Sequence, residues 1–359
     1  MSLDERIDLF AIKTQIERIS ESLELGALVG DLAFLRRARR ALLPLPLVDR
    51  REEIDASRVF PPFESRPVPE LGKRVALVAS GGGGAAVALV GVARAFEEAG
   101  LEPAEIVSCS GGAIWGSMWA AGMSAQEMAE FSLSWRPEDY LDVQWLGLPR
   151  FALSALRGFT GIAKGEAIEQ LFDGRFRQMA CGETAIPITT IVYNMDLGTV
   201  EYFGSTRTPE VTIGHLVRVA IALPLFIESV DVGGHLYVDG GIIEVWPAQP
   251  VIEEGDFDHV FGVNFMLPKG FRPRDISGWP DRLGGLFEAS RQMQQGYHLE
   301  LARRAREQLG ENLTVIDPVE DSELHGTSFY DLFLDRGHWP RLMRQGYDAA
   351  SEALDAFRG

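Results

Sequence analysis

The stretch from residue 73 to residue 122 constrains the fold of this chain more than any other. It contains the apolar run RVALVAS, four adjacent glycines, a helix-like segment that closes on Gly100, a second apolar run AEIVSCS, and GAIWGSMWAAG, which ends at Gly122. Short β-branched apolar runs are typical of buried parallel strands, and a glycine after the last periodic residue is typical of a helix end. Two successive strand–loop–helix units therefore predict an α/β domain whose mostly parallel sheet carries helices on both faces.

The remainder of the chain continues the same alternation. Further strands are predicted in IPITTIVYNMD, TVEYFG, HLYVDGG, HVFGVNFM and LTVIDP, and helices in LVRVAIALPLF, at about 284–309 and at about 340–358. The 359 residues, 46% of them apolar, are enough to bury a sizeable core. We place one main domain at residues 73–359.

Residues 1–72 show a different sequence pattern from the main domain. Apolar residues at steps of three and four predict a helix over residues 1 to about 43, and prolines punctuate the stretch from 44 to 69. We interpret residues 1–72 as an N-terminal helical extension followed by a linker or extended arm. This region would cover a site, join two subunits into an oligomer, or complete the core.

Charge and composition exclude several classes of function. A net charge of -18 opposes the binding of nucleic acids, and the two cysteines, Cys109 and Cys181, form neither a disulfide framework nor a zinc-binding pattern. No basic start with an uninterrupted apolar run is visible at the N-terminus, and no window approaches the roughly 20 apolar residues that span a bilayer. We expect a cytoplasmic protein whose contact with a membrane, if any, is peripheral.

The glycine loop is open to two functional interpretations. Gly81, Gly83 and Ala86 satisfy the G-x-G-x-x-A fingerprint of dinucleotide-binding domains, but the second strand then needs an acidic residue at its end, and it ends in Ser108-Cys109-Ser110. Consecutive glycines also let backbone N–H groups point into one concavity that stabilises an oxyanion. A third, structural interpretation is a tight turn that permits close helix packing.

Ser110 lies where a nucleophile would be expected. A strand-to-helix nucleophile elbow usually has the pattern G-x-S-x-G; here Gly112 supplies the second glycine and Ser108 replaces the first. A serine at this turn also lies at a helix N-terminus, which favours developing negative charge. Cys109 is a competing nucleophile, although it occupies the variable position of the pattern, and we interpret Ser108 as structural.

A nucleophilic serine needs a proton acceptor. None of the six histidines sits in an obvious strand-end loop, and His338 in DRGHWP is the least easily dismissed. Asp239 in LYVDGG is the better candidate, because it ends an apolar strand and two glycines follow it. A strand-end aspartate also forms turns through its own hydrogen bonds, so a structural role stays open.

Three motifs, LVASGGGG, SCSGG and YVDGG in this order, resemble those of the patatin-like phospholipase family, and the likeness extends over about residues 73–359. The resemblance implies a three-layer α/β fold and a Ser–Asp dyad of Ser110 and Asp239 without a histidine. It implies an enzyme that hydrolyses lipid acyl esters (phospholipid, lysophospholipid or acylglycerol) and requires no metal or organic cofactor. The oxyanion-binding and substrate-binding residues that it implies are Gly82, Gly83, Gly84 and Gly111.

The chain departs from the family pattern in three places. Ala85 and Ala86 replace a basic residue and a glycine, Ser108 replaces the first elbow glycine, and Val245-Trp246-Pro247 replaces an Asn-x-Pro. These changes leave two alternatives open: a catalytically impaired lipid-binding protein, in which the loop no longer forms an oxyanion hole, or an acyltransferase that uses the same acyl-serine. The apolar stretch at 145–159 would be a lid, a lipid-facing surface or a packed helix.

Overall fold

The computed structural model describes residues 54–68, 74–140, 142, 161–267, 282–319 and 336–357. The strands are β1 (Val75–Ala79), β2 (Glu105–Ser108), β3 (Gly161–Ala163), β4 (Ile188–Asn194), β5 (Thr199–Gly204), β6 (Leu225–Ile227), β7 (Val230–Val232), β8 (His235–Asp239), β9 (His259–Val263) and β10 (Leu313–Ile316). The α-helices are α3 (Leu89–Ala99), α4 (Gly111–Ala120), α5 (Ala125–Ser134), α6 (Pro137–Tyr140), α8 (Glu166–Phe176), α9 (Ile213–Ala220), α10 (Gln249–Glu254), α11 (Arg282–Leu309) and α13 (Trp339–Asp355). The glycine loop continues into the 3-10 helix η2 (Gly83–Ala88).

An eight-stranded sheet forms the centre of the molecule. Its order is β10-β9-β1-β2-β4-β8-β7, and β5 pairs with β4. Strands β10, β9, β1, β2 and β4 are parallel, whereas β5 and β8 run antiparallel to β4. The prediction of an α/β fold with a mostly parallel sheet is confirmed. The sequence patterns did not predict β7 or the separate pair of β3 and β6.

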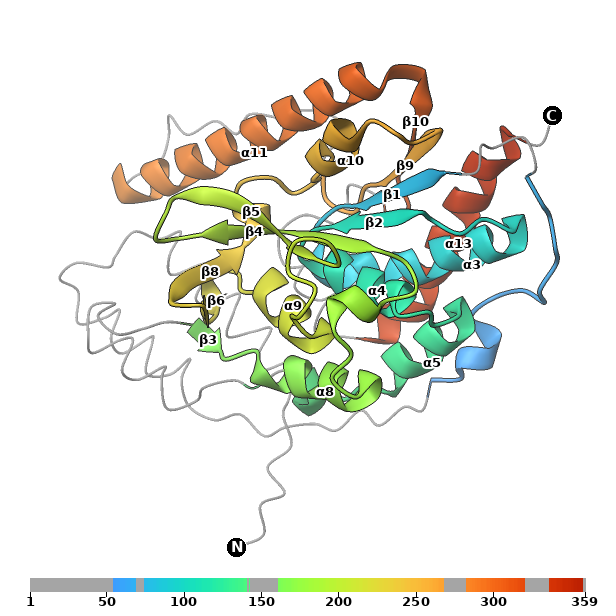
Figure 1. Cartoon of the computed structure of the whole chain (residues 1–359), viewed down its shortest axis with the longest axis horizontal. Coiled ribbons are helices and arrows are strands. Elements are labelled where there is room, and N and C mark those ends of the chain that lie inside the picture. Colours follow the sequence, from blue (N-terminus) through green and yellow to red (C-terminus); the bar gives the residue numbers. More distant parts are fainter. Residues whose placement is uncertain are drawn as a thin grey trace, which may run out of the picture.

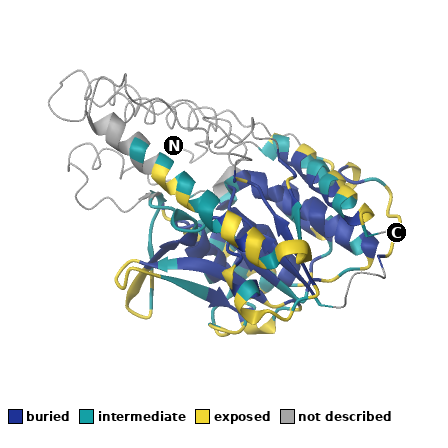
Figure 2. Cartoon of the chain, turned by 90° about the horizontal axis from the view of Figure 1, so that it is seen from above, coloured by how far each residue is buried: buried dark blue, intermediate teal, exposed yellow. Residues whose placement is uncertain are grey.

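Helices cover both faces of this sheet and complete three layers (Figure 1). α10 and α11 lie on one face, and α3, α4 and α13 lie on the other. Alternate residues of β1 serve the two cores: Leu77 and Ala79 belong to the larger one, and Ala76 and Val78 belong to the one beneath α10 and α11. All five β1 residues are therefore buried, which explains why their sequence is apolar throughout rather than alternating (Figure 2).

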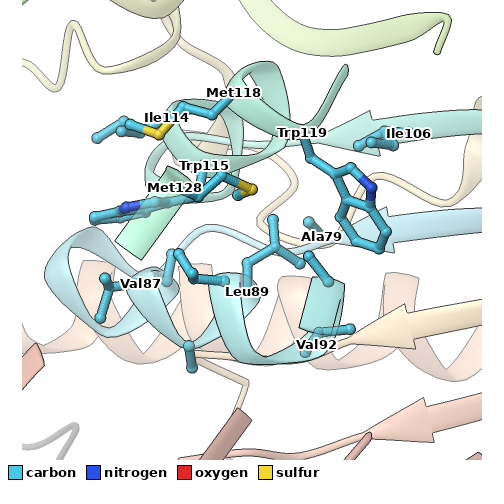
Figure 3. Close-up of a cluster of buried hydrophobic side chains, with 14 of the residues drawn as sticks. Ala79, Val87, Leu89, Val92, Ile106, Ile114, Trp115, Met118, Trp119 and Met128 are labelled. Atoms are coloured by element: carbon cyan, nitrogen blue, oxygen red, sulfur yellow. The ribbon is translucent and has the colours of Figure 1, made fainter. Parts of the chain in front are cut away.

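The larger core fixes the position of α4. Val87 and Leu89, on either side of Ala88, pack with Trp115 and Met118 of α4 (Figure 3), and all four side chains are fully buried. Trp115 also meets the Trp339 ring edge-on at a centroid distance of 5.7 Å. Each such side chain stabilises the fold by about 2 to 3 kcal/mol. The N-terminus of α4 is thus held by dense packing along the helix behind it.

Residues 54–68 form an arm that packs on the end of α3. The N–H of Val68 donates to the carbonyl of Ala99, and Val59 and Phe60 are buried in the larger core. The part of the chain before residue 73 therefore contributes to the hydrophobic core. The predicted N-terminal helix, with its proposed role in oligomers, and the apolar stretch 145–159 lie outside the described residues.

Candidate active site

Strand β4 brings the ends of β2 and β8 together. Ser108, the last residue of β2, pairs with Thr190, and Asp239, the last residue of β8, pairs with Val192. Val192 also pairs with Glu201 of β5, so β5 occupies one edge of β4, and β2 and β8 share the other. β2 and β8 run toward each other along this edge. Their last residues are two positions of β4 apart, or about 7 Å, so the turns that follow them meet.

Ser110 occupies the turn after β2 in a strained backbone conformation. Its φ is 48° and its ψ is -123°, and it is the N-cap residue of α4. A positive φ is rare for a residue with a side chain and is typical of a serine held on a nucleophile elbow. The residue is partly exposed, while the helix behind it is buried. The elbow geometry predicted for Ser110 is therefore present.

Ser108 fits the elbow although it carries a side chain. Its hydroxyl lies 2.8 Å from the Thr190 hydroxyl, and both side chains are fully buried. A Cβ placed on Gly116 would lie 3.7 Å from the Ser108 Cβ and 3.3 Å from the nearest Ile106 methyl. Even a Cβ at Gly116 would make only ordinary contact with Ser108, so α4 leaves space for the Ser108 side chain. This departure from the family pattern is compatible with the turn.

Asp239 is a buried carboxylate beside the serine, with an exposure of 2%. Burial raises the pKa of Asp239 to about 6, and hydrogen bonds from the Ser110 hydroxyl, the Gly241 N–H and the Cys109 thiol oppose this rise. The Gly241 nitrogen lies 2.8 Å from Oδ1 of the carboxylate. A carboxylate with this pKa is mostly ionised at pH 7 and is more basic than an exposed aspartate. It is suited to accept the proton of Ser110.

Cys109 has the environment of an inert thiol. Its side chain is fully buried, and its Sγ lies 3.9 Å from Oδ1 of Asp239. Burial, followed by the charges of Asp239 and Glu244, raises the pKa of the Cys109 thiol well above its usual range. A thiolate nucleophile is disfavoured at this position.

The histidines with hydrogen-bond partners in the structure engage groups other than the serine and the aspartate. His215 Nδ1 lies 2.8 Å from Oε1 of Glu169, and His259 Nε2 lies 2.9 Å from the Thr314 hydroxyl. His298 lies against the carbonyls of Ile242 and Ile243, and burial lowers its pKa. His338, singled out in the sequence, is the N-cap residue of α13.

The glycine loop contacts the elbow directly. A Cβ on Gly81 would lie 3.3 Å from the Ser110 Cβ, and a Cβ on Gly111 would lie 2.8 Å from the Gly83 nitrogen, so only glycine fits at Gly111 without a shift. Gly83 has a φ of 51°, which also favours glycine. The predicted neighbourhood of the loop and the serine is present.

The N–H groups of this loop differ in their availability. The Gly81 N–H donates to the carbonyl of Val245 at 2.8 Å. Within the described ranges, the N–H groups of Gly82, Gly83 and Gly84 donate no backbone hydrogen bond. The N–H of Gly111, the first residue of α4, is free in the same sense. These are the four residues that the family resemblance implies.

Sequence reasoning missed residues that support the site. The Ser80 hydroxyl hydrogen-bonds to the Gly81 carbonyl in the glycine loop and to the Phe265 N–H after β9. The Gln294 side chain of α11 donates to the carbonyl of Ile242, three residues after Asp239, at 2.6 Å. The polar residue that ends the apolar run RVALVA could have indicated Ser80. No pattern in the sequence connects α11 to the Asp239 turn.

The residues that the structure describes hold neither a metal-binding cluster nor a membrane-spanning helix. Nowhere in this part of the chain do three His, Cys, Asp or Glu side chains come together as they would around a metal ion. None of its helices combines the length and the apolar character needed to cross a membrane.

Fold and site together define an α/β sandwich with a strained serine, a buried carboxylate and free backbone N–H groups at one edge of its sheet. Comparison with known families makes this class more specific. Residues 77–252 match the family described as patatin-like phospholipase.

Individual relatives are more distant. An uncharacterised NTE family protein of Mycobacterium bovis is 29% identical over 178 residues, which are 50% of this chain and 45% of that protein. An uncharacterised protein of Bacillus subtilis is 26% identical over 62% of this chain and 82% of its own length. The chain thus spans under half the length of the mycobacterial relative.

Two solved structures are similar to this one at low sequence identity. The structure of VipD from Legionella pneumophila is 14% identical, covers 80% of this chain and 67% of its own, and has a TM-score of 0.45. That of the type III effector protein ExoU is 16% identical, covers 80% of this chain and 54% of its own, and has a TM-score of 0.43.

Proposed function

We propose that this protein is a serine acyl hydrolase that cleaves lipid acyl esters through a Ser110–Asp239 dyad. The observation that carries the proposal is the meeting of three features: a strained serine at a helix N-terminus, a buried carboxylate whose pKa the serine hydroxyl lowers, and N–H groups of a glycine loop beside them. The match of residues 77–252 to the patatin-like phospholipase family supports a lipid ester as the substrate.

The reaction begins with proton transfer from the Ser110 hydroxyl to the Asp239 carboxylate as the serine oxygen attacks the ester carbonyl carbon. The tetrahedral intermediate then collapses, the bond to the leaving alkoxide breaks, and the protonated Asp239 returns the proton to it. The released alcohol leaves an acyl-serine. Water attacks this acyl group while Asp239 accepts its proton, and the second collapse frees the carboxylic acid and restores the serine hydroxyl.

The negative charge that develops on the carbonyl oxygen needs donors. We assign this role to the backbone N–H groups of Gly82, Gly83, Gly84 and Gly111, because the loop and the elbow touch and these N–H groups have no backbone acceptor within the described ranges. The N-terminal end of α4 adds a favourable dipole. Loss of one donor in such a hole typically costs on the order of 100- to 1000-fold in rate.

A surface beside this site is suited to a lipid aggregate. Six of the seven exposed large apolar side chains among the described residues belong to segments that follow β4 or β9, to β8 or to α11. We call these six the apolar rim: Met195, Leu197, Leu236, Met266, Met293 and Tyr297. Exposed apolar groups gathered around a site are typical of an interaction surface.

The structure connects both parts of the apolar rim to the Asp239 strand. On one side, the Met195 N–H donates to the carbonyl of Leu236, and Leu236 belongs to β8 together with Asp239. On the other, Met293 and Tyr297 flank Gln294, which holds the turn after Asp239. We therefore propose that the protein binds lipid surfaces peripherally with the apolar rim around Ser110.

Charge favours one kind of lipid surface. The carboxylate of Asp196 accepts the Leu236 N–H at 2.7 Å, so an acidic group lies among the apolar side chains of the rim. With a net charge of -18, the protein is repelled by anionic headgroups. Neutral or zwitterionic lipids are the expected partners.

Labelling with a fluorophosphonate tests the proposed nucleophile. The wild-type protein should react once per chain, and peptide mass mapping should place the label on Ser110. Ser110→Ala should abolish labelling, whereas Cys109→Ala should keep it, because the buried thiol takes no part.

Two outcomes would overturn the proposal. One is the absence of labelling in the folded wild-type protein, both in buffer and in detergent that opens any covering segment. The other is labelling that survives in Ser110→Ala. Products separate hydrolysis from acyl transfer, since a hydrolase gives mainly free acid even when an alcohol acceptor is added.

A further inference from the structure

Ser80 lies between the end of β1 and the glycine loop and is fully buried. Its hydroxyl accepts the N–H of Phe265 at 2.8 Å and donates to the carbonyl of Gly81 at 2.9 Å. Its own N–H donates to the carbonyl of Val263 at 3.0 Å. One side chain thereby connects the ends of β1 and β9 to the first peptide unit of the loop.

The hydrogen bond to the Gly81 carbonyl has a consequence for the next nitrogen. In a trans peptide unit the C=O and the N–H point in opposite directions, and the described chain has no cis peptide bonds. The Gly81 carbonyl and the Gly82 N–H belong to the same unit. By holding the carbonyl, the Ser80 hydroxyl fixes the direction of the Gly82 N–H on the opposite side of the peptide plane.

The geometry points to Ser80 as the positioning residue that sets this peptide plane and so aims the Gly82 N–H at the oxyanion. Glycines on both sides leave the plane little steric resistance to rotation, because neither neighbour has a Cβ. A rotation of about 180° would turn a donor into a carbonyl and bring negative partial charge to the place where the oxyanion forms. The inference deepens the proposed function and rests on it.

Two further contacts restrict the loop around Ser80. The Gly81 N–H donates to the carbonyl of Val245, six residues after Asp239, so the preceding peptide unit is held as well. A Cβ on Gly82 would lie 2.5 Å from the Phe265 Cβ, so Phe265 presses directly on the loop. These contacts fix the position of the loop, and the Ser80 hydroxyl is the group that bonds to the carbonyl between Gly81 and Gly82.

Two substitutions separate hydrogen bonding from packing. Ser80→Ala removes the hydroxyl, whereas Ser80→Cys retains nearly the same shape and hydrogen-bonds only weakly. Ser132→Ala is the matched control, because Ser132 is also fully buried and its hydroxyl accepts a hydrogen bond from the Trp115 indole at 3.0 Å. All are assayed in the full-length chain with a soluble p-nitrophenyl ester, together with Ser110→Ala.

We expect Ser80→Ala and Ser80→Cys to lower kcat by about 10- to 100-fold with KM within twofold, somewhat less than the loss of a whole donor. The affinity for a trifluoromethyl ketone, whose adduct with serine carries an oxyanion, should fall in proportion to kcat. The affinity for the free fatty acid should stay unchanged. Ser132→Ala should keep kcat within twofold even where its thermal stability falls as much as that of Ser80→Ala.

Several results would overturn the inference. If folded Ser80→Ala keeps the wild-type kcat, the hydroxyl has no positioning role. If Ser80→Cys keeps the wild-type kcat while Ser80→Ala is slow, Ser80 acts through packing alone. A loss that appears in KM alone, or that Ser132→Ala reproduces, would do the same. Full activity of Ser110→Ala would instead refute the proposed function, and the role of Ser80 would fall with it.

Discussion

The reaction centre buries polar groups, whereas the apolar rim exposes apolar ones. At the centre a carboxylate is 2% exposed and a thiol is fully buried beside the partly exposed Ser110, whereas at the rim Leu197 is 60% exposed and Met293 is 75% exposed. Elsewhere in the described chain the large apolar side chains are buried or partly buried, with Phe63 as the exception. Burying a charge and exposing apolar groups both cost free energy, so their coincidence at one edge of the sheet indicates function rather than folding.

The largest expected effect comes from a substitution in the reaction centre, which should act on every substrate whether or not the apolar rim binds it. Asp239→Asn removes the proton acceptor while keeping the shape, and it should lower kcat on the order of 1000-fold for a soluble ester and for lipid in vesicles alike. The same variant should be more stable at pH 7 by about 3 kcal/mol, because ionising a carboxyl whose pKa is about 6 when folded and about 3.9 when unfolded costs free energy of folding.

Steady-state kinetics and urea unfolding at pH 7 and pH 4 measure the two effects. A raised pKa means that the wild-type protein loses this stability as the pH rises from about 4 to about 6. The stability gain of Asp239→Asn should therefore vanish at pH 4. A variant that is slow because it is unfolded, or one that loses stability at pH 7, would contradict the assignment of Asp239 as a buried base.

The pH profile should identify the centre independently of any substitution. The value of kcat/KM for a soluble ester should rise about tenfold per pH unit below pH 6 and level off above it, because only the ionised Asp239 accepts a proton. Glu244, whose pKa burial raises to about 7, titrates nearby. In Glu244→Gln the break near 6 should remain, and its disappearance would assign it to Glu244 instead.

Most of the fold and of the centre could be predicted from the sequence because local patterns specify them. The buried strands are apolar, the glycines mark their ends, and parallel strands end at one edge, so Ser110 and the loop of Gly81 to Gly84 follow from the order of elements. The approach of Asp239 depends on β8 running antiparallel along β4. The apolar strand and the two glycines after it indicated this residue, but only the register of β8 on β4 explains how it reaches the serine.

Other features depend on contacts between segments far apart in the sequence. Ser80 and Phe265 are 185 positions apart, and no pattern in the sequence indicates their hydrogen bond. The apolar rim joins side chains from four separate segments, and each of them, taken singly, is an ordinary surface residue. Sequence periodicity reports which face of an element is buried, but it does not report which exposed side chains become neighbours after folding.

The smallest expected effect tests the rim. Leu197→Asp and Met293→Asp should each lower hydrolysis of phosphatidylcholine vesicles by about 5- to 10-fold, since each removes roughly 1 to 2 kcal/mol of apolar contact with the lipid surface. Hydrolysis of a soluble ester should stay within twofold. Phe63→Asp is the matched control, because Phe63 is 57% exposed on the arm and lies outside the rim.

Cosedimentation of each Asp variant, combined with Ser110→Ala, measures vesicle binding without turnover. Binding should weaken in parallel with vesicle hydrolysis, and vesicles with anionic lipid should bind the protein less than neutral ones. Equal losses in Phe63→Asp would contradict a defined rim. If the two rim substitutions instead abolish a dimer in sedimentation and leave vesicle binding intact, the rim joins two copies of the chain, and the inverted polarity at this edge serves assembly rather than access to lipid.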